Sequence, residues 1–322
     1  MNNYHKYLTV TAAEEAWGFY LTTVGYSRIG PHQAYPPNQE HPLTHSFSWN
    51  KGRILNGYYL VFISKGRGIF ESALTEPALI NAGTCFFLFP GVWHRYKPDA
   101  DSGWEEYWIG FKGSYPDELM NKGFFDPRSP VMSAGLHEDL LTLIFKILDH
   151  VRSAPLGYHH VIAGITLEIL GLVYALSKQE DSAGDPDGQV ISHAKFILRE
   201  NLEGPLDMEA LVRELAIGYS KFRKMFKQAT GQSPNQYHIN LRLDKAKELL
   251  NTTNLNVTEV AYQLGFDSVF YFSRLFKKKN RISPKSYRAS VSSDARRISD
   301  PVMKSPVLPV IPQEDRADDA NN

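Results

Sequence analysis

Residues 256–288, NVTEVAYQLGFDSVFYFSRLFKKKNRISPKSYR, decide the fold of the second half of this 322-residue chain, because they repeat an earlier stretch. The earlier copy is LVRELAIGYSKFRKMFKQATGQSPNQY, residues 211–237, and its aromatic, basic and turn residues recur 50 positions later. Upstream of them the offset is 49, so the second copy has one extra residue in its turn. Self-similarity of this kind predicts one supersecondary unit that occurs twice. The identical positions are Phe222, Phe226, Lys227, Ser233, Pro234 and Tyr237 in the first copy and Phe272, Phe276, Lys277, Ser283, Pro284 and Tyr287 in the second.

Each copy is predicted to form a helix, a tight turn and a second helix. In the second copy Thr258 is placed to begin the first helix, Gly265 supplies a left-handed stop, and Asp267 or Ser268 caps the next helix. A long helix over residues 234–250 is predicted to join the two copies. It would set the two second helices about one DNA turn apart on the same side of a duplex.

The second helix of each copy combines an aromatic inner face with a basic outer face. Such a helix fits a DNA major groove, where Arg makes bidentate contacts to guanine or holds phosphate. A charged outer face is also the ordinary solvated surface of a helix, but both copies are basic on the equivalent face, and this favours DNA. The candidate DNA-binding residues are Ser220, Lys221, Arg223, Lys224 and Lys227 in the first copy and Val269, Phe270, Ser273, Arg274 and Lys277 in the second.

The distribution of charge supports the same interpretation. The whole chain is neutral, with 35 basic and 35 acidic residues, which by itself suggests an enzyme. Residues 1–189 hold 14 basic and 20 acidic residues, whereas residues 190–290 hold 17 basic and 9 acidic residues. The region that contains the repeat therefore carries a net charge of +8 and the region before it −6, which is typical of a nucleic-acid-binding segment joined to an acidic partner.

The first half of the chain has the pattern of an antiparallel β-domain. From residue 20 to residue 113, short apolar runs such as NGYYLVFI and TCFFLFP alternate with turn signals such as SKGRG and NAG. This spacing predicts a β-sandwich or β-barrel. Apolar residues then recur at intervals of three and four over residues 136–151 and 159–177, which predicts two amphipathic helices separated by the breaker SAPLG.

Composition excludes several other classes of protein. The single cysteine, Cys85, forms no internal disulfide, and its isolation favours a reducing compartment. The first residues, MNNYHKYLTV, lack the pattern of a signal peptide. The most apolar long run, residues 161–176, is too short to span a bilayer and carries Glu168. We therefore expect a cytoplasmic protein, and the family resemblance given next implies a bacterial, DNA-associated one.

Residues 190–288 resemble the DNA-binding domain of AraC/XylS-type bacterial transcription regulators. Two positions depart from the pattern of that family. Arg281 stands where Gly is usual, so that Asn280 beside it is expected to take the left-handed conformation. Gly218 stands where Ser or Thr usually caps the first reading helix. The resemblance rests on Ala261, Gly265, Phe266, Tyr271, Phe272, Arg274, Phe276, Ser283, Pro284 and Tyr287.

The stretch over residues 25–113 resembles the cupin-type ligand-binding barrel that accompanies this DNA-binding domain in sugar-responsive regulators. Trp104, Glu106 and Trp108 alternate along one predicted strand, so they point to the same side of it. Aromatic faces with a few charged groups are typical of carbohydrate sites, although Trp and Tyr in a barrel are more often core residues. The resemblance implies Lys65, Tyr96, Glu106 and Trp108 as ligand-binding residues, with His94 and Trp104 as neighbours.

Together the two resemblances imply an α+β multidomain chain. A cupin-like antiparallel β-barrel and a helical dimerisation segment precede an all-α domain with two helix-turn-helix units. The expected domains are the ligand-sensing barrel at 1–130, the dimerisation segment at 131–180, a linker at 181–189, the DNA-binding domain at 190–289 and a disordered tail at 290–322.

The function implied is that of a sequence-specific DNA-binding transcription regulator, expected to be an activator, that a small polar ligand controls. A carbohydrate is the expected ligand. The expected partners are double-stranded DNA and a second copy of the chain, with RNA polymerase as a further candidate. The alternative for the two predicted helices is that they only cover the barrel.

Two other functions remain open. A metal-dependent cupin enzyme needs an HxH pair and a Glu on strands before the PGxxH element, but no histidine occurs between His45 and His94. We therefore expect no metal, no cofactor and no catalytic residue. An architectural DNA binder without a ligand is the third hypothesis, and a solidly filled barrel would favour it.

Overall fold

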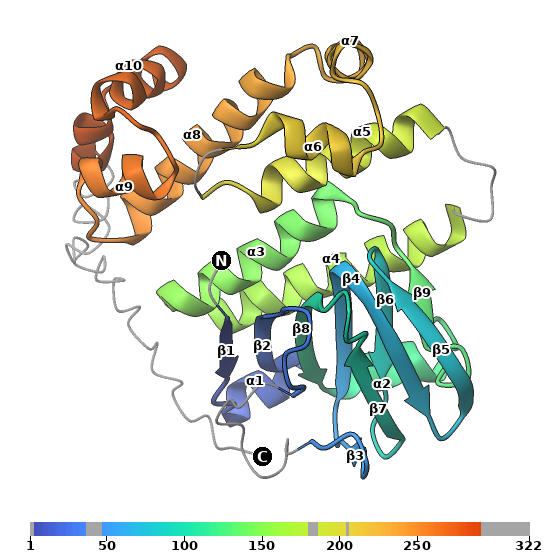
Figure 1. Cartoon of the computed structure of the whole chain (residues 1–322). Helices are drawn as coiled ribbons and strands as arrows, with labels where there is room; N and C mark the ends of the chain where they lie inside the picture. Colours follow the sequence, from blue (N-terminus) through green and yellow to red (C-terminus); the bar gives the residue numbers. More distant parts are fainter. Residues whose placement is uncertain (1–2, 37–46, 180–185, 204–205, 291–322) are drawn as a thin grey trace, which may run out of the picture.

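A computed structural model describes residues 3–36, 47–179, 186–203 and 206–290. The chain forms an N-terminal antiparallel sheet domain and a C-terminal helical domain, as predicted (Figure 1). We call them the sensor domain and the DNA-binding domain, after the functions that the family resemblance implies for them. The nine strands are β1 (Tyr4–Tyr7), β2 (Tyr20–Ile29), β3 (Arg53–Ile54), β4 (Tyr58–Ser72), β5 (Thr75–Asn81), β6 (Thr84–Leu88), β7 (Trp93–Pro98), β8 (Trp104–Lys112) and β9 (Val131–Ser133).

Strand β4 is the centre of the sheet. Its first half pairs with β6 and β8, and its second half pairs with β5 and β7. The change of partners occurs at a register shift between Ile63 and Lys65, next to Gly66, whose φ of +79° favours glycine. The stretch SKGRG, which we expected to be a turn between two strands, is therefore a corner within one strand. The tendency of a twisted strand to bend at a glycine explains the difference.

The two faces of this sheet pack differently. Leu60 and Phe62 belong to a core shared with the helices, whereas Val61 and Ile63 belong to a second core on the opposite face of the sheet, which we call the barrel interior. The alternation follows from the period of two along a strand. The helices of the sensor domain are α1 (Ala12–Ala16), α2 (Ser114–Asn121), α3 (Glu138–Ser153) and α4 (Tyr158–Gln179).

Helix α4 is unusually apolar for its position. By length and composition alone, its segment Tyr158–Lys178 is long and apolar enough to cross a membrane. The expectation that the apolar run at 161–176 is too short to span a bilayer is therefore wrong. Ile162, Ile169 and Val173 of α4 are nevertheless buried in the core shared with the sheet. Only 33% of the most apolar window is buried inside the chain, so much of the helix remains uncovered.

The DNA-binding domain contains two small cores joined by one helix. Phe222 and Phe226 are fully buried in the first core, and Phe272 and Phe276 are fully buried in the second. The long connecting helix α8 supplies residues to both cores, as the sequence predicts. The helices of this domain are α5 (Pro186–Glu200), α6 (Met208–Glu214), α7 (Tyr219–Thr230), α8 (Pro234–Thr252), α9 (Val257–Gln263) and α10 (Val269–Asn280).

The ends of these helices correct two predictions. Asn256, not Thr258, caps α9, and Glu259 completes its capping box. Arg281 itself takes the left-handed conformation, with φ +67°, rather than Asn280. The position follows the end of α10, where the chain must reverse, and Gly231 has the same conformation after α7. Gly265 is left-handed, as predicted.

Several boundaries also differ from the sequence-based expectation. The predicted linker at 181–189 ends early, because α5 begins at Pro186 and Pro is favoured in the first turn of a helix. The predicted dimerisation segment at 131–180 begins with strand β9, which pairs with β6 of the sheet. Residues 181–185 of the linker and 291–322 of the tail lie outside the described residues.

Candidate DNA-binding and ligand-binding sites

Helices α7 and α10 present the candidate DNA-binding residues on their outer faces, except for Val269, which packs against the second core. Each helix is fixed to its core by two phenylalanines, which leaves the opposite face accessible. Phe270, at the second position of α10, is 90% exposed, although it is a large apolar side chain. Val269 and Ser273 are half-buried, and the exposed members are Ser220, Lys221, Arg223, Lys224, Lys227, Phe270, Arg274 and Lys277.

The starts of the two reading helices differ as the sequence predicts. Ser268 caps α10, and its hydroxyl accepts a hydrogen bond from the Tyr271 backbone at 3.3 Å. Gly218 precedes α7 and provides no side-chain cap. The guanidinium of Arg274 lies over the ring of Tyr271, 5.6 Å from its centroid, which limits the positions that this cation samples.

The barrel interior contains most of the predicted ligand-binding residues. Trp104 and Trp108 of β8 belong to or pack against the inner core, and Glu106 between them points to the same side. The ring of Trp108 lies on Gly25 of β2, where an added Cβ would come within 2.2 Å of the ring. Glycine is therefore required there for the indole to lie flat against the sheet.

A basic residue that the sequence patterns did not mark contacts two residues of this interior. Arg53 of β3 donates from Nη2 to the Tyr96 hydroxyl at 2.5 Å and from Nε to His94 Nε2 at 3.3 Å. His94 Nδ1 therefore carries the proton and donates to the Val92 carbonyl at 3.1 Å. Burial and the charge of Arg53 lower the pKa of His94 to about 4, so this imidazole is neutral at pH 7.

Glu106 is a buried carboxyl group in the same interior. Burial raises its pKa to about 8, and the charge of Arg53 and the Tyr35 hydroxyl only partly oppose this effect. Tyr35 donates to Glu106 Oε2 at 3.3 Å, and its ring packs edge-on against Trp104. We call Tyr35, Arg53, His94, Tyr96 and Glu106 the interior polar cluster.

Polar atoms near this cluster lack partners. Trp104 Nε1 and Ser27 Oγ are buried and find no hydrogen-bond partner among the described residues. Ser27 lies opposite Glu106 in the pairing of β2 with β8. Buried polar groups without partners are rare in folded proteins and are often satisfied by a ligand or water. A cavity of about 790 Å³, lined by Tyr35, Trp49 and Lys97 among others, adjoins the cluster.

Lys65 is not part of the interior polar cluster. It is exposed, and its charge acts on Glu200 of α5, outside the barrel. The register shift in β4 next to Lys65 changes the side to which this residue points, and no sequence pattern locates such a shift. Arg53, Tyr35 and Ser27 were missed because they are single polar residues without a spacing that marks them.

The outer face of β8 connects this site to the DNA-binding domain. Tyr107, between Glu106 and Trp108, points to the opposite side of the strand, and its hydroxyl lies 3.5 Å from the Glu200 carboxylate of α5. Burial raises the pKa of Glu200 to about 7. One strand therefore contacts the interior with one face and the DNA-binding domain with the other.

The described residues contain no group of three or more His, Cys, Asp or Glu side chains that could hold a metal ion. Within that part of the chain, His94 faces Arg53, a cation, rather than further ligands. His41 and His45 lie outside the described residues.

Comparisons with known proteins agree with this two-domain arrangement. Residues 39–156 match the AraC-like ligand binding domain, and residues 211–290 match a helix-turn-helix domain. The MmsAB operon regulatory protein of Pseudomonas aeruginosa is 28% identical over 73% of this chain and 76% of its own length. The raffinose operon regulator RafR of Pediococcus pentosaceus is 28% identical, covering 76% and 90%, and the arabinose operon regulatory protein of Escherichia coli is 26% identical, covering 73% and 81%.

Among solved structures, the DNA-binding domain of AdpA in complex with a target DNA is 32% identical and matches 36% of this chain and 99% of that chain, with a TM-score of 0.31. The chain contains an AraC-like ligand binding domain followed by a helix-turn-helix domain. It therefore belongs to the AraC family of DNA-binding transcriptional regulators.

Proposed function

We propose that this regulator binds DNA through α7 and α10 and activates transcription when a carbohydrate occupies the sensor barrel in the bacterial cytoplasm. The observation that carries the DNA-binding part is the repeated reading helix, which is anchored by two buried phenylalanines and basic on its exposed face in both copies. A basic helix anchored in this way is suited to enter a major groove.

The two reading helices differ in the residues that they present, so we propose that they bind different base sequences. Arg274 is placed to contact a base, and Lys277, one turn further along α10, is placed to contact phosphate. Both side chains are exposed, and the position of Arg274 over Tyr271 supports a directed contact.

Arg274→Ala is expected to lower the affinity for a preferred duplex by about 1 to 3 kcal/mol and to relax the preference at one base pair. Lys277→Ala is expected to weaken the binding of all DNA sequences alike. It is also expected to reduce the magnitude of the slope of the logarithm of the DNA-binding constant against the logarithm of the salt concentration by about one. Binding of duplexes from a randomised pool, measured by fluorescence anisotropy at several salt concentrations, tests both.

Lys279→Ala is the matched control for this pair. Its ammonium group is held by Asp244 at 2.7 Å and by the Asn240 carbonyl at 2.9 Å, on α8 and away from the reading face. The control is expected to bind as the wild type does. If all three variants bind equally, the proposed reading face is wrong.

A carbohydrate ligand is supported by the interior polar cluster and by the unpartnered atoms beside it. Two indoles, a half-buried cation and a buried carboxyl group suit a ligand with an apolar ring face and several hydroxyl groups. The names of the raffinose and arabinose operon regulators point to the same class. The neighbouring cavity and the orphan polar atoms favour a ligand over a solidly filled barrel.

A thermal-shift screen of mono- and oligosaccharides tests this class of ligand. A bound sugar is expected to stabilise the sensor domain by about 3 kcal/mol when its concentration is a hundred times its Kd. Glu106→Gln is expected to reduce the shift, and Glu76→Gln, at an exposed position of β5, is expected to leave it unchanged. A sugar that shifts both variants equally would argue against the interior polar cluster as its site.

We also propose that the chain forms a homodimer and that α4 forms the interface between the two copies. Its uncovered face carries Val161, Gly164, Glu168, Gly171 and Ala175, at alternating intervals of three and four residues. This spacing is typical of a coiled-coil seam, and small residues permit close approach of two helices. Sedimentation velocity of the full chain measures the dimer, and RNA polymerase remains a further candidate partner.

A metal-dependent enzyme is the competing function for the barrel. Metal analysis of the purified chain distinguishes the two, because stoichiometric iron, manganese or nickel would favour the enzyme.

A further inference from the structure

A buried carboxylate, Glu138, lies at one of the contacts between the sensor domain and the DNA-binding domain. Glu138, the first residue of α3, accepts a hydrogen bond from Arg199 Nε of α5 at 2.7 Å and from the Tyr237 hydroxyl of α8 at 2.6 Å. Glu138 is only 9% exposed, so both contacts are largely shielded from water. Charged hydrogen bonds in such surroundings are stronger than those at a surface. We call Glu138, Arg199 and Tyr237 the Glu138 latch.

A second polar contact follows the same pair of helices. Asp149, near the end of α3, accepts from Lys245 of α8 at 2.6 Å. Helix α8 is therefore held to α3 at two places along its length. Because α8 supplies residues to the cores of both helix-turn-helix units, a restraint on α8 acts on both reading helices.

Helix α5, which supplies Arg199 to the Glu138 latch, also makes an apolar contact with the sensor domain. Phe196 of α5 is fully buried in the sensor core, where it packs against Phe62 at a centroid distance of 6.1 Å. This apolar contact anchors α5 in the sensor in addition to its polar contacts through Arg199 and Glu200, whereas Tyr237 and Lys245 attach α8 through polar contacts. Helix α5 is anchored in the apolar core of the sensor, whereas α8 is attached to the sensor through polar contacts. Helix α8 can therefore separate from the sensor more easily than α5.

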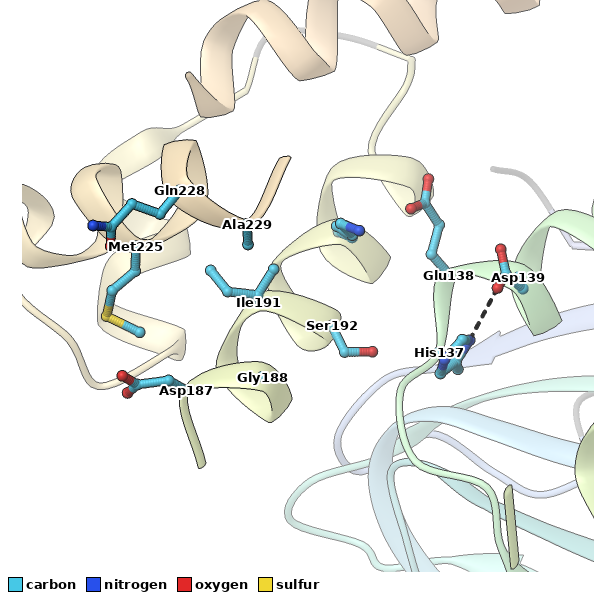
Figure 2. Close-up of a pocket in the computed structure, with 11 residues that line it drawn as sticks. His137, Glu138, Asp139, Asp187, Gly188, Ile191, Ser192, Met225, Gln228 and Ala229 are labelled. Carbon is cyan, nitrogen blue, oxygen red and sulfur yellow. Dashed lines mark ion pairs between the residues drawn. The ribbon is translucent and has the colours of Figure 1, made fainter. Parts of the chain in front are cut away.

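Helix α7 does not pack tightly against the sensor domain. A cavity of about 500 Å³ lies between the start of α3 and the reading helix, with α5 as a third wall (Figure 2). His137, Glu138 and Asp139 face it from the sensor, and Met225 and Gln228 face it from α7. The unit that contains α7 therefore has space to shift when the Glu138 latch opens.

Comparing Tyr237 with its equivalent in the second copy, Tyr287, distinguishes the packing of the ring from the contact that the hydroxyl group makes with the sensor. The ring of Tyr237 packs edge-on against Phe226 at 5.3 Å, and Tyr287 packs in the same way against Phe276 at 5.7 Å. The Tyr237 hydroxyl binds Glu138, whereas the Tyr287 hydroxyl makes no hydrogen bond to another described residue. The tyrosine ring therefore stabilises each helix-turn-helix unit, and the hydroxyl group of Tyr237 in addition bonds to the sensor domain.

We propose that the Glu138 latch holds the DNA-binding domain in a docked state of low DNA affinity and that opening the latch raises this affinity. The inference rests on the proposed DNA-binding function. Docking places the basic domain against a sensor half with a net charge of −6, which weakens its attraction for DNA.

The test compares Tyr237→Phe with Tyr287→Phe in the full-length chain. The probe is a duplex that the wild-type chain enriches from a randomised pool, and binding is measured by fluorescence anisotropy at fixed salt. Tyr237→Phe is expected to bind the duplex about threefold to tenfold more tightly than the wild type, because it loses one charged hydrogen bond of the docked state. Tyr287→Phe keeps the same ring and is expected to bind as the wild type does.

Glu138→Gln provides a second variant, and combining it with Tyr237→Phe is expected to add less than the sum of the two single effects, since both act on one contact. Faster hydrogen exchange in α8 of Tyr237→Phe, but not of Tyr287→Phe, is expected alongside. If the wild type binds DNA and Tyr237→Phe binds equally or more weakly, the latch alone is overturned. If the wild type enriches no duplex, the DNA-binding proposal fails, and the latch fails with it.

Discussion

Phe276→Ala is expected to destabilise the second helix-turn-helix unit by about 3 to 5 kcal/mol, because the substitution empties the centre of a small core. Phe276 is fully buried, and its ring packs between Phe272 and Tyr287. The cavity that this substitution creates lies between α10 and the rest of the second helix-turn-helix unit. Loss of specific DNA binding is therefore expected to accompany the loss of stability. The sensor domain has a separate core and should remain folded.

Phe270→Ala is the matched control, since it removes the same side chain from the same helix. Phe270 is 90% exposed, so its removal is expected to change stability by no more than about 0.5 kcal/mol. Native-state hydrogen exchange of the amides of α9 and α10 measures the local free energy of opening in both variants. Equal protection in the two variants would contradict the assignment of one face of α10 to the core and the other to solvent.

Glu106→Gln is expected to stabilise the sensor domain increasingly as the pH rises. The pKa of Glu106 is raised to about 8 from an ordinary value of 4.5. Between these values the folded protein keeps a proton that the unfolded chain releases, so the free energy of unfolding of the wild type falls as the pH rises. The stability is fully present below pH 4.5 and is lost as the pH passes through 8.

Glutamine remains neutral at every pH and resembles the protonated acid in shape. The advantage of Glu106→Gln over the wild type is expected to grow by about 3 kcal/mol between pH 5.5 and 8.5. Urea unfolding of the sensor domain within the full chain, followed by tryptophan fluorescence at both pH values, measures this change. Glu76→Gln should show no such growth. If the two variants respond alike to pH, the carboxyl group of Glu106 is not buried as described.

Local and periodic features of the fold could be predicted from the sequence. The repeat predicts both helix-turn-helix units and the long helix α8 that joins them, and the spacing of apolar residues predicts α3 and α4 close to their observed bounds. These features depend on contacts between residues near one another in the sequence. The alternation of Trp104, Glu106 and Trp108 is of the same kind, since the period of a strand alone places them on one side.

Features that depend on an irregularity of the backbone could not be predicted. The corner in β4 turns an expected loop into continuous strand and moves Lys65 out of the interior. The left-handed conformation at Arg281 is set by the reversal of the chain after α10, although Asn280 has the better intrinsic preference. In both cases the surrounding structure outweighs the preference of the single residue.

The sequence by itself determined the division of this neutral chain into an acidic sensor half and a basic DNA-binding half, because charge and repeat are properties of order along the chain. Only the tertiary structure decided that Arg53 lies beside Tyr96 and that Glu138 lies between Arg199 and Tyr237. These partners are 43, 61 and 99 positions apart. No periodic pattern reaches so far, and such contacts exist only because the packing of whole sheets and helices brings distant polar groups together away from water.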